Sequence, residues 1–244
     1  MSVVYKCACQ GTFGVSGMKR LSILSLLLAG QVLTACATAT APPPSAARVA
    51  SFMEQGREVV APSGMVALCA QDPSACPRAA EDTLRAAEPV QLTAEHWALL
   101  DKVNRDVNDQ IHPASDEAVY GVDERWTNPL LQKTSNRAFV SGDCEDYALA
   151  KRDALLAAGW PAESLFMAVG LHDRLGLHTV LVARTSRGDM VLDSRTPWIV
   201  GFNDAPYLWI KRQVAADSLR WVGVWREAPT SPTSLASLSV PINR

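Results

Sequence analysis

The sequence predicts an α+β domain in which helices come first, an antiparallel sheet follows, and one helix packs on that sheet. Helical periodicity marks the first half of the domain, with one apolar stripe after Thr93 and a second within residues 144–158. Short runs of alternating apolar residues follow between residues 164 and 225, which is typical of strands. The 244 residues, 48% of them apolar and 20% charged, are enough for one well-packed domain or at most two.

The two ends of the chain differ in composition from its centre. A basic start at Met18 and the short apolar run after it form a typical secretory signal, so we expect translation to begin at Met18. An alanine- and proline-rich stretch comes next, and the last residues are rich in serine, threonine and proline. The predicted boundaries are residues 1–36 for the signal segment with its upstream extension, 37–50 for a tether, 51–227 for the folded domain and 228–244 for a flexible tail.

The apolar run of the signal ends in the four residues LTAC, which finish at Cys36 and resemble a bacterial lipoprotein cleavage box. Cys36 would then be lipidated, become the mature N-terminus and tether the protein to a membrane. Cleavage by an ordinary signal peptidase after Ala37 is the alternative, and it would leave Thr38 as the first residue. Both interpretations predict export.

The use of cysteine agrees with an oxidising compartment. Cys69 and Cys76 flank a turn-like hexapeptide and are the natural candidates for a disulfide; the alternative is that both stay reduced and only pack. No further pair of cysteines or histidines has the spacing of metal ligands, which disfavours a zinc site. The net charge of −2 gives no electrostatic reason to expect a nucleic-acid partner.

The first clear helix is predicted to begin at Thr93, whose side chain is a good N-cap. Asn104 and Asn108 share one face of this helix, and we expect them to hold the loop that follows. Residues 109–139 are rich in turn-forming residues and should wall one side of a cleft, where Trp126 either shields a reactive group or packs in the core. The apolar stripe, which is expected to be core, consists of Trp97, Leu100, Val103 and Val107.

The next helix carries a cysteine at its predicted N-terminus. The sequence SGDCEDY places Cys144 in the first turn, with Asp143 as the N-cap. Unpaired N–H groups and the helix dipole favour a thiolate at such a position. The alternative is that Asp143, Glu145 and Asp146 only match the dipole and that Cys144 is a small buried residue.

A histidine and an aspartate follow on two runs that alternate like strands. His178 and Asp193 flank a hairpin turn within residues 185–189, and the exact position of that turn leaves the strand register open. A cysteine peptidase needs a thiolate, an imidazole that takes and returns the proton, and a group that orients the imidazole. We therefore assign these roles to Cys144, His178 and Asp193, with His172 as the rival for the base.

The order of these motifs resembles the papain-like and transglutaminase-like superfamily. The residues of these motifs are similar to those of the bacterial transglutaminase-like cysteine peptidases, the family of the LapG-type periplasmic proteases. The cysteine block is the most specific motif, and the other motifs gain their weight from their order. The similar segments are VNRDVN at 103–108, WTNP at 126–129, GDCEDY at 142–147, AKR at 150–152, LHTVL at 177–181 and VLDS at 191–194.

The resemblance implies a papain-like fold and an exported, periplasmic cysteine endopeptidase. It further implies a protein substrate such as a large surface adhesin, a membrane-bound regulator, and calcium at the acids that flank the cysteine, which here are Asp143 and Glu145. The residues themselves favour a cation, because three carboxylates beside Cys144 disfavour its thiolate unless a hard divalent ion neutralises them. Asp146 and Asp116 are further candidate ligands, and a simple helix cap without metal is the alternative.

Two other classes of function remain open at this point. The same chemistry directed at an amine would make the protein a transglutaminase or an amidase, which are acyl transferases. Loss of activity would leave a periplasmic binding protein, although the intact Cys144, His178 and Asp193 argue against this class.

Overall fold

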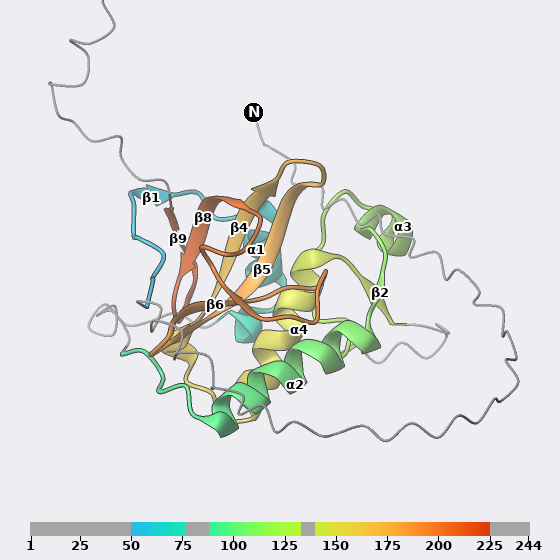
Figure 1. The fold of residues 1–244 in the computed structure, drawn as a ribbon. Coiled ribbons are helices and arrows are strands. Elements are labelled where there is room, and N and C mark those ends of the chain that lie inside the picture. Colours follow the sequence, from blue (N-terminus) through green and yellow to red (C-terminus); the bar gives the residue numbers. More distant parts are fainter. Residues whose placement is uncertain (1–49, 77–87, 133–139, 225–244) are drawn as a thin grey trace, which may run out of the picture. The chain divides into compact units, whose positions relative to one another are not determined.

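The computed structural model describes residues 50–76, 88–132 and 140–224 of the chain. The predictions for the signal segment, for lipidated Cys36 and for the C-terminal tail concern residues outside these ranges. The helices and strands, shown in Figure 1, are β1 (Glu58–Val59), α1 (Ser63–Gln71), η1 (Pro73–Ala75), α2 (Ala94–Gln110), β2 (His112–Pro113), α3 (Asp116–Tyr120), β3 (Ser141–Gly142), α4 (Cys144–Ala157), η3 (Ala162–Ser164), β4 (Leu165–His172), β5 (Gly176–Thr185), β6 (Gly188–Leu192), β7 (Val200–Gly201), β8 (Leu208–Val214) and β9 (Asp217–Gly223).

The main sheet has seven strands in the order β1-β9-β8-β4-β5-β6-β7, and all of its pairings are antiparallel. The strands from β4 to β9 follow one another along the chain, so the second half of the domain is one continuous antiparallel unit. The α+β architecture predicted from the sequence is therefore confirmed. A short parallel pair, β2 with β3, lies outside this sheet and leads into α4.

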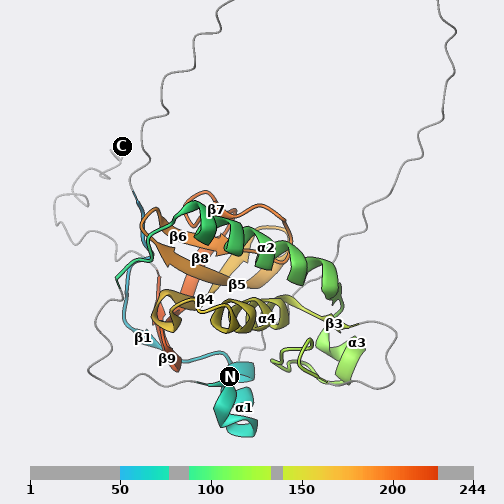
Figure 2. The same cartoon turned by 90° about the horizontal axis from the view of Figure 1, so that it is seen from below.

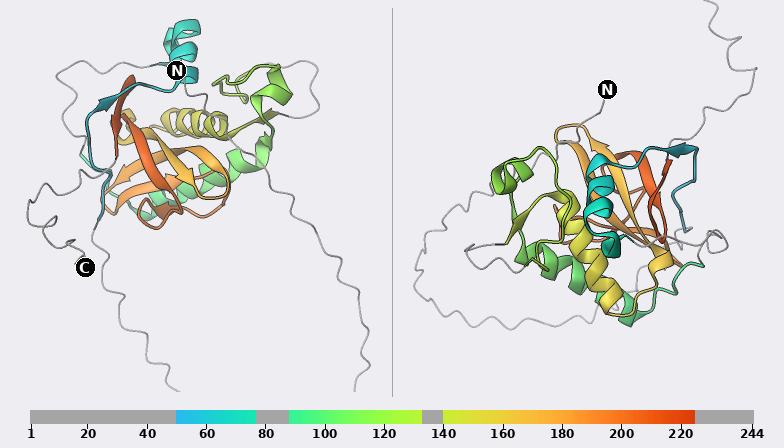
Figure 3. Two further views of the ribbon diagram at one scale, coloured as in Figure 1. Left: turned by 90° about the horizontal axis from the view of Figure 1, so that it is seen from above. Right: turned by 180° about the vertical axis from the view of Figure 1, so that it is seen from behind.

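Helix α4 lies against one face of the sheet, and α2 runs beside it; Figure 2 shows the two helices from below. Helix α1 is on the same side of the sheet, as Figure 3 shows. The predicted stripe of α2 is buried at Leu100, Val103 and Val107, whereas Trp97 remains 38% exposed. Trp97 was thus wrongly predicted as core: it lies near the start of α2, before the buried part of the stripe, which begins at Leu100.

Two basic residues of α4 are buried in spite of their charge. Lys151 is fully buried and Arg152 is 6% exposed, because α1, α2 and the sheet surround α4. Arg152 donates to the backbone oxygen of Ala75 at 2.8 Å and so ties η1 to α4. The predicted disulfide, Cys69–Cys76, closes this α1–η1 segment with an S–S distance of 2.06 Å.

The other face of the sheet has a smaller apolar core. An ion pair between Arg184 and Asp189 lies near it, next to the turn that joins β5 to β6. Asp189 is fully buried and accepts two hydrogen bonds from Arg184, at 2.9 and 3.0 Å. It also accepts the backbone N–H of Met53 at 2.7 Å, which holds the first described residues against β6. Among the residues described, no helix is both long and apolar enough to span a membrane.

The β5–β6 hairpin settles the register that the sequence left open. Thr185 pairs with Gly188, so the turn consists of the two residues between them. The last pair of this ladder joins Leu181 to Leu192, and the residues of β5 before Leu181 have no neighbour from β6. Asp193 follows directly on the end of β6, so its side chain meets His178 diagonally rather than straight across.

Candidate active site

The site lies where α4 begins and where β6 stops covering β5. Cys144, the first residue of α4, is 3% exposed. Its Sγ lies 3.2 Å from the backbone nitrogen of Thr179, whose N–H points to it from the uncovered stretch of β5. The same Sγ lies 3.2 Å from Oε2 of Glu145. The sulfur therefore has a main-chain donor on one side and a carboxylate on the other.

His178, which directly precedes Thr179 in β5, meets Asp193. Nε2 of His178 is 2.7 Å from Oδ1 of Asp193, and both side chains are buried. Oδ1 also accepts the backbone N–H of Arg195 at 3.0 Å, and Oδ2 accepts the hydroxyl of Tyr207 at 2.5 Å. Burial opposes ionisation of Asp193, but the hydrogen bond and charge of His178, with the other two donors, lower its pKa to about 2. The aspartate is therefore a carboxylate at neutral pH.

The backbone around Asp193 is held by α2. Asn108 donates its side-chain amide to the backbone oxygen of Asp193 at 3.0 Å and to that of Thr196 at 3.2 Å. Asn104 donates to the backbone oxygens of Thr196 and Pro197, each at 3.2 Å. The two asparagines thus fasten the loop after β6, not the loop after α2 as predicted, because α2 packs beside the end of β6.

His172 does not take the place of His178. It ends β4, and its Nδ1 lies 2.9 Å from Asp173, whose side chain is 78% exposed. The ring of His172 touches Tyr207 edge-on, with centroids 5.9 Å apart. It is therefore the ring of His178, and not that of His172, that meets the buried carboxylate of Asp193.

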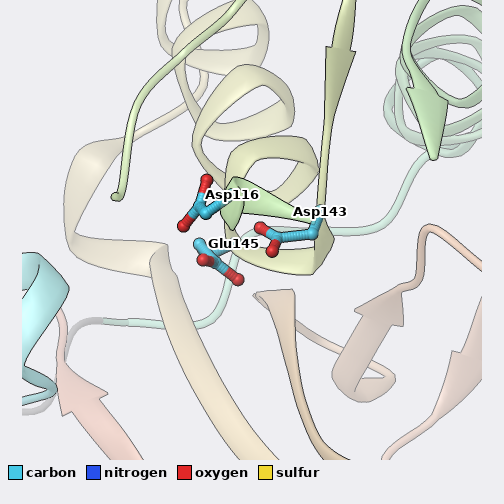
Figure 4. Close-up of side chains that lie close together, drawn as sticks. All are labelled: Asp116, Asp143 and Glu145. Atoms are coloured by element: carbon cyan, nitrogen blue, oxygen red, sulfur yellow. The ribbon is translucent and has the colours of Figure 1, made fainter. Parts of the chain in front are cut away.

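Three acids gather on the far side of Cys144, as Figure 4 shows. Asp116, Asp143 and Glu145 are all buried, and each offers a carboxylate oxygen within 4.8 Å of the others. Oδ1 of Asp116 and Oδ1 of Asp143 have no hydrogen-bond partner among the described residues. Burial and the charge of Asp143 raise the pKa of Asp116 to about 6, and burial and the same charge also raise the pKa of Glu145 well above its ordinary value. Buried oxygen ligands without donors fit a hard divalent cation.

The structure changes two of the predicted roles of the acids around Cys144, those of Asp143 as a cap and of Asp146 as a ligand. Asp143 is the N-cap residue of α4, but its side chain caps no N–H of the helix, because the carboxylate turns to the acid cluster. Asp146 lies outside that cluster and accepts the backbone N–H of Thr127 at 2.9 Å. A Cβ at Gly142 would come within 2.4 Å of Asp146, which explains why a residue without a side chain precedes this turn.

Trp126 serves both of the roles between which the sequence left a choice. It is 4% exposed and packs against Trp221 with ring centroids 6.5 Å apart. It also lines a small cavity beside Cys144, together with Glu124 and Leu177. Its indole N–H donates to Glu124 at 2.8 Å, which holds the ring at this wall.

Both the sequence and the fold are similar to those of known proteins. The family model described as bacterial transglutaminase-like cysteine proteinase matches residues 55–228. Among solved structures, the chain is similar to calcium-bound Legionella pneumophila LapG, with 22% identity, a TM-score of 0.45, and coverage of 61% of this chain and 77% of that chain. EGTA-treated L. pneumophila LapG has 24% identity and a TM-score of 0.40, with coverage of 48% and 62%. Comparison with curated proteins gives no match.

Proposed function

Because the chain belongs to the bacterial transglutaminase-like cysteine proteinases and is thus a cysteine peptidase of papain-like α+β fold, we propose that Cys144, His178 and Asp193 form its catalytic triad. The observation that carries this proposal is the 2.7 Å contact between His178 and Asp193 at the strand whose Thr179 N–H reaches the cysteine sulfur. A cysteine, an imidazole and an orienting carboxylate are the groups that thiol catalysis of peptide hydrolysis requires.

The hydrogen bond to Asp193 assigns the two nitrogens of His178. Since ionised Asp193 accepts from Nε2, that nitrogen carries the proton, and Nδ1 is the basic nitrogen of the neutral ring. Nδ1 takes the proton of Cys144, and Sγ attacks the peptide carbonyl carbon to form a tetrahedral intermediate. The intermediate collapses to a thioester when the amine leaves with the proton from His178. Water, deprotonated by the same nitrogen, then releases the acid and restores the thiol.

The developing negative charge needs donors at the carbonyl oxygen. The backbone N–H of Cys144 is at the N-terminus of α4, where the helix dipole adds to its effect. The N–H of Thr179 already lies at the sulfur, where it stabilises the thiolate before attack. Both donors belong to the main chain, so the pre-organisation comes from the fold.

We further propose that Asp116, Asp143 and Glu145 hold a calcium ion. The support is the set of buried carboxylate oxygens, two of which have no donor among the described residues. A bound calcium ion would supply the positive charge that offsets these carboxylates beside the sulfur. Asp143 and Glu145 would fix the start of α4, while Asp116 would join α3 to it.

The substrate of a peptidase is a protein, and we propose an extracellular or periplasmic one, such as a surface adhesin, with a membrane-bound regulator. This follows from the LapG-type resemblance. We also propose export through the signal segment and lipidation at Cys36, which would make the protein a membrane-anchored periplasmic lipoprotein. Intact mass of the membrane fraction tests the anchor: a lipidated chain beginning at Cys36 is expected, and an unmodified chain beginning at Thr38 would reject it.

The triad is tested by comparing surface and secreted proteins of the wild-type strain with those of strains carrying single variants. Cys144→Ala and His178→Ala should abolish cleavage, and Asp193→Asn should leave part of it, because the aspartate orients the base and does not react. Thr179→Val is a matched control that keeps the backbone donor, so cleavage should persist. Shortened proteins mean hydrolysis, whereas cross-linked or amine-modified proteins would mean acyl transfer. Normal cleavage in Cys144→Ala would reject the mechanism.

A further inference from the structure

Tyr207, which directly precedes β8, touches two members of the proposed triad at once. Its hydroxyl donates to Oδ2 of Asp193 at 2.5 Å. Its ring stacks on the ring of His178, with centroids 5.4 Å apart and planes inclined by 23°. In the sequence, Tyr207 is one of many residues in the alternating apolar runs between 164 and 225, and no local pattern distinguishes it from an ordinary core tyrosine.

We propose that Tyr207 is a positioning residue that fixes the imidazole of His178 through its stacked ring and through Asp193. The inference rests on the proposed triad and adds a fourth side chain to it. Nε2 of His178 donates to Asp193, and a hydrogen bond fixes the direction of its donor more strictly than the tilt of the ring that carries it. A second ring stacked on one face opposes this tilt.

The hydroxyl of Tyr207 acts on the carboxylate itself. Asp193 uses Oδ1 for His178 and for the N–H of Arg195, and Tyr207 is the side chain that holds Oδ2. Charge-assisted hydrogen bonds of this kind are short and directional, so the carboxylate cannot rotate about its own axis. With both oxygens fixed, the direction from Asp193 to His178 is fixed as well.

The backbone beneath makes room for this arrangement. Gly170 of β4 is the cross-strand partner of His178. A Cβ at Gly170 would lie 2.7 Å from Cβ of Tyr207 and 3.1 Å from the next ring carbon, so any side chain there would displace the tyrosine. The ladder between β4 and β8 also shifts register between Val169 and Gly170. A glycine opposite the histidine is thus what allows the tyrosine ring to reach it.

The competing explanation is that Tyr207 only fills the sheet face, since it also packs against Trp209 with centroids 5.4 Å apart. A purely structural tyrosine would affect the melting temperature and leave the reactivity of Cys144 unchanged. The two explanations therefore separate in an assay that needs no substrate: the rate at which iodoacetamide alkylates Cys144 in the full chain with calcium present, read from the mass of the modified peptide.

We expect Tyr207→Phe, which keeps the ring and loses the hydroxyl, to slow alkylation by about tenfold, the effect of one charge-assisted hydrogen bond. Tyr207→Leu loses both contacts and should slow it by a further several-fold, so that phenylalanine partly rescues the rate. Gly170→Ala should behave like Tyr207→Leu. Gly201→Ala is the matched control, because a Cβ there meets only Asp204 at an ordinary 3.6 Å, and its rate should equal that of the wild type.

The result also separates this inference from the triad on which it rests. If His178→Ala alkylates as fast as the wild type, the triad is rejected, and the role of Tyr207 is rejected with it. If His178→Ala is slow while Tyr207→Phe and Tyr207→Leu match the wild type, the triad stands and Tyr207 is only a packing residue. Equal loss in Tyr207→Phe and Tyr207→Leu would reject the contribution of the stacked ring.

Discussion

Replacing Asp116 by asparagine should have opposite effects on stability with and without calcium. Burial and Asp143 raise the pKa of Asp116 to about 6 in the folded chain, whereas an unfolded aspartate titrates near 4. Because the pKa of Asp116 is higher in the folded than in the unfolded chain, protonation of Asp116 stabilises the fold. This stabilisation is complete below about pH 4 and is lost as pH rises through about 6. The shift of about 2 pKa units corresponds to about 3 kcal/mol of the free energy of unfolding.

In EGTA the Asp116→Asn variant cannot ionise at this position and avoids that loss. It should therefore melt several degrees above the wild type near pH 8, since about 1 kcal/mol shifts the melting temperature of a domain of this size by about 2–4 °C. The advantage should disappear toward about pH 5, where Asp116 is protonated in the wild type. With calcium at about 1,000 times its dissociation constant, binding adds about 4.1 kcal/mol to the wild type, which exceeds the about 3 kcal/mol lost by ionisation of Asp116. The variant keeps two of the three carboxylates, so the order of melting temperatures should reverse.

Differential scanning fluorimetry of the full chain measures these melting temperatures between about pH 5 and about pH 8. The wild type and the Asp116→Asn variant are each measured with EGTA and with calcium. Asp173→Asn is the control, because the Asp173 side chain is 78% exposed and lies outside the acid cluster. It should change the melting temperature equally in both solutions. A difference between Asp116→Asn and wild type that is the same with calcium as with EGTA would show that these acids hold no cation.

Three further predictions concern the scaffold. Asp189→Ala leaves Arg184 without its buried partner and should lower the free energy of unfolding by about 3–5 kcal/mol in urea titrations; a loss below about 1 kcal/mol would contradict this account. Replacing Cys69 and Cys76 by serine should lower the free energy of unfolding by about 2–3 kcal/mol in the same assay. The loss is modest because removing the bridge across a short loop adds little entropy to the unfolded chain, and no change would mean that the bridge adds no stability. Burial lowers the pKa of Lys151 to about 7, and its amino group has no hydrogen-bond partner among the described residues. Lys151→Met should therefore raise the melting temperature most below about pH 7 and lose this advantage toward about pH 10, whereas an advantage independent of pH would point to packing alone.

Local patterns in the sequence indicated much of what the structure brings together. The N-terminal position of Cys144 followed from a helix start. The strand position of His178 followed from alternation around a turn, whereas Asp193, also predicted on a strand, lies one residue beyond the end of β6. The disulfide between Cys69 and Cys76 followed from their spacing in a chain expected to be exported. These features depend on neighbours within a few residues, and that range is accessible to sequence patterns.

The features that the sequence did not reveal depend on packing between distant segments. The sequence offered Asp116 only as one further candidate ligand, because it lies in a five-residue helix inside a turn-rich stretch and reaches Glu145 only in the folded chain. Tyr207 and Asn108 each donate a hydrogen bond to Asp193 from another element of the fold, and the periodicity of the sequence does not predict such contacts. The burial of Lys151 was not apparent either, because it comes from α1, α2 and the sheet packing around this part of α4, whereas Ala157 near the end of the helix is exposed.

The first described residues enter the domain at the end of the sheet remote from the cysteine. Ser51 bridges to Gly188 and accepts the backbone N–H of Asp189 at 2.9 Å, beside the turn that joins β5 to β6. Between that turn and His178 lie seven residues of β5, a span of about 23 Å at the usual rise of a strand. An anchor attached upstream of Ser51 would therefore hold the enzyme at the end of the sheet opposite to the active-site cysteine. With the proposed anchor, the end of the sheet that carries Cys144 would be the one turned toward polypeptides that stand out from the membrane.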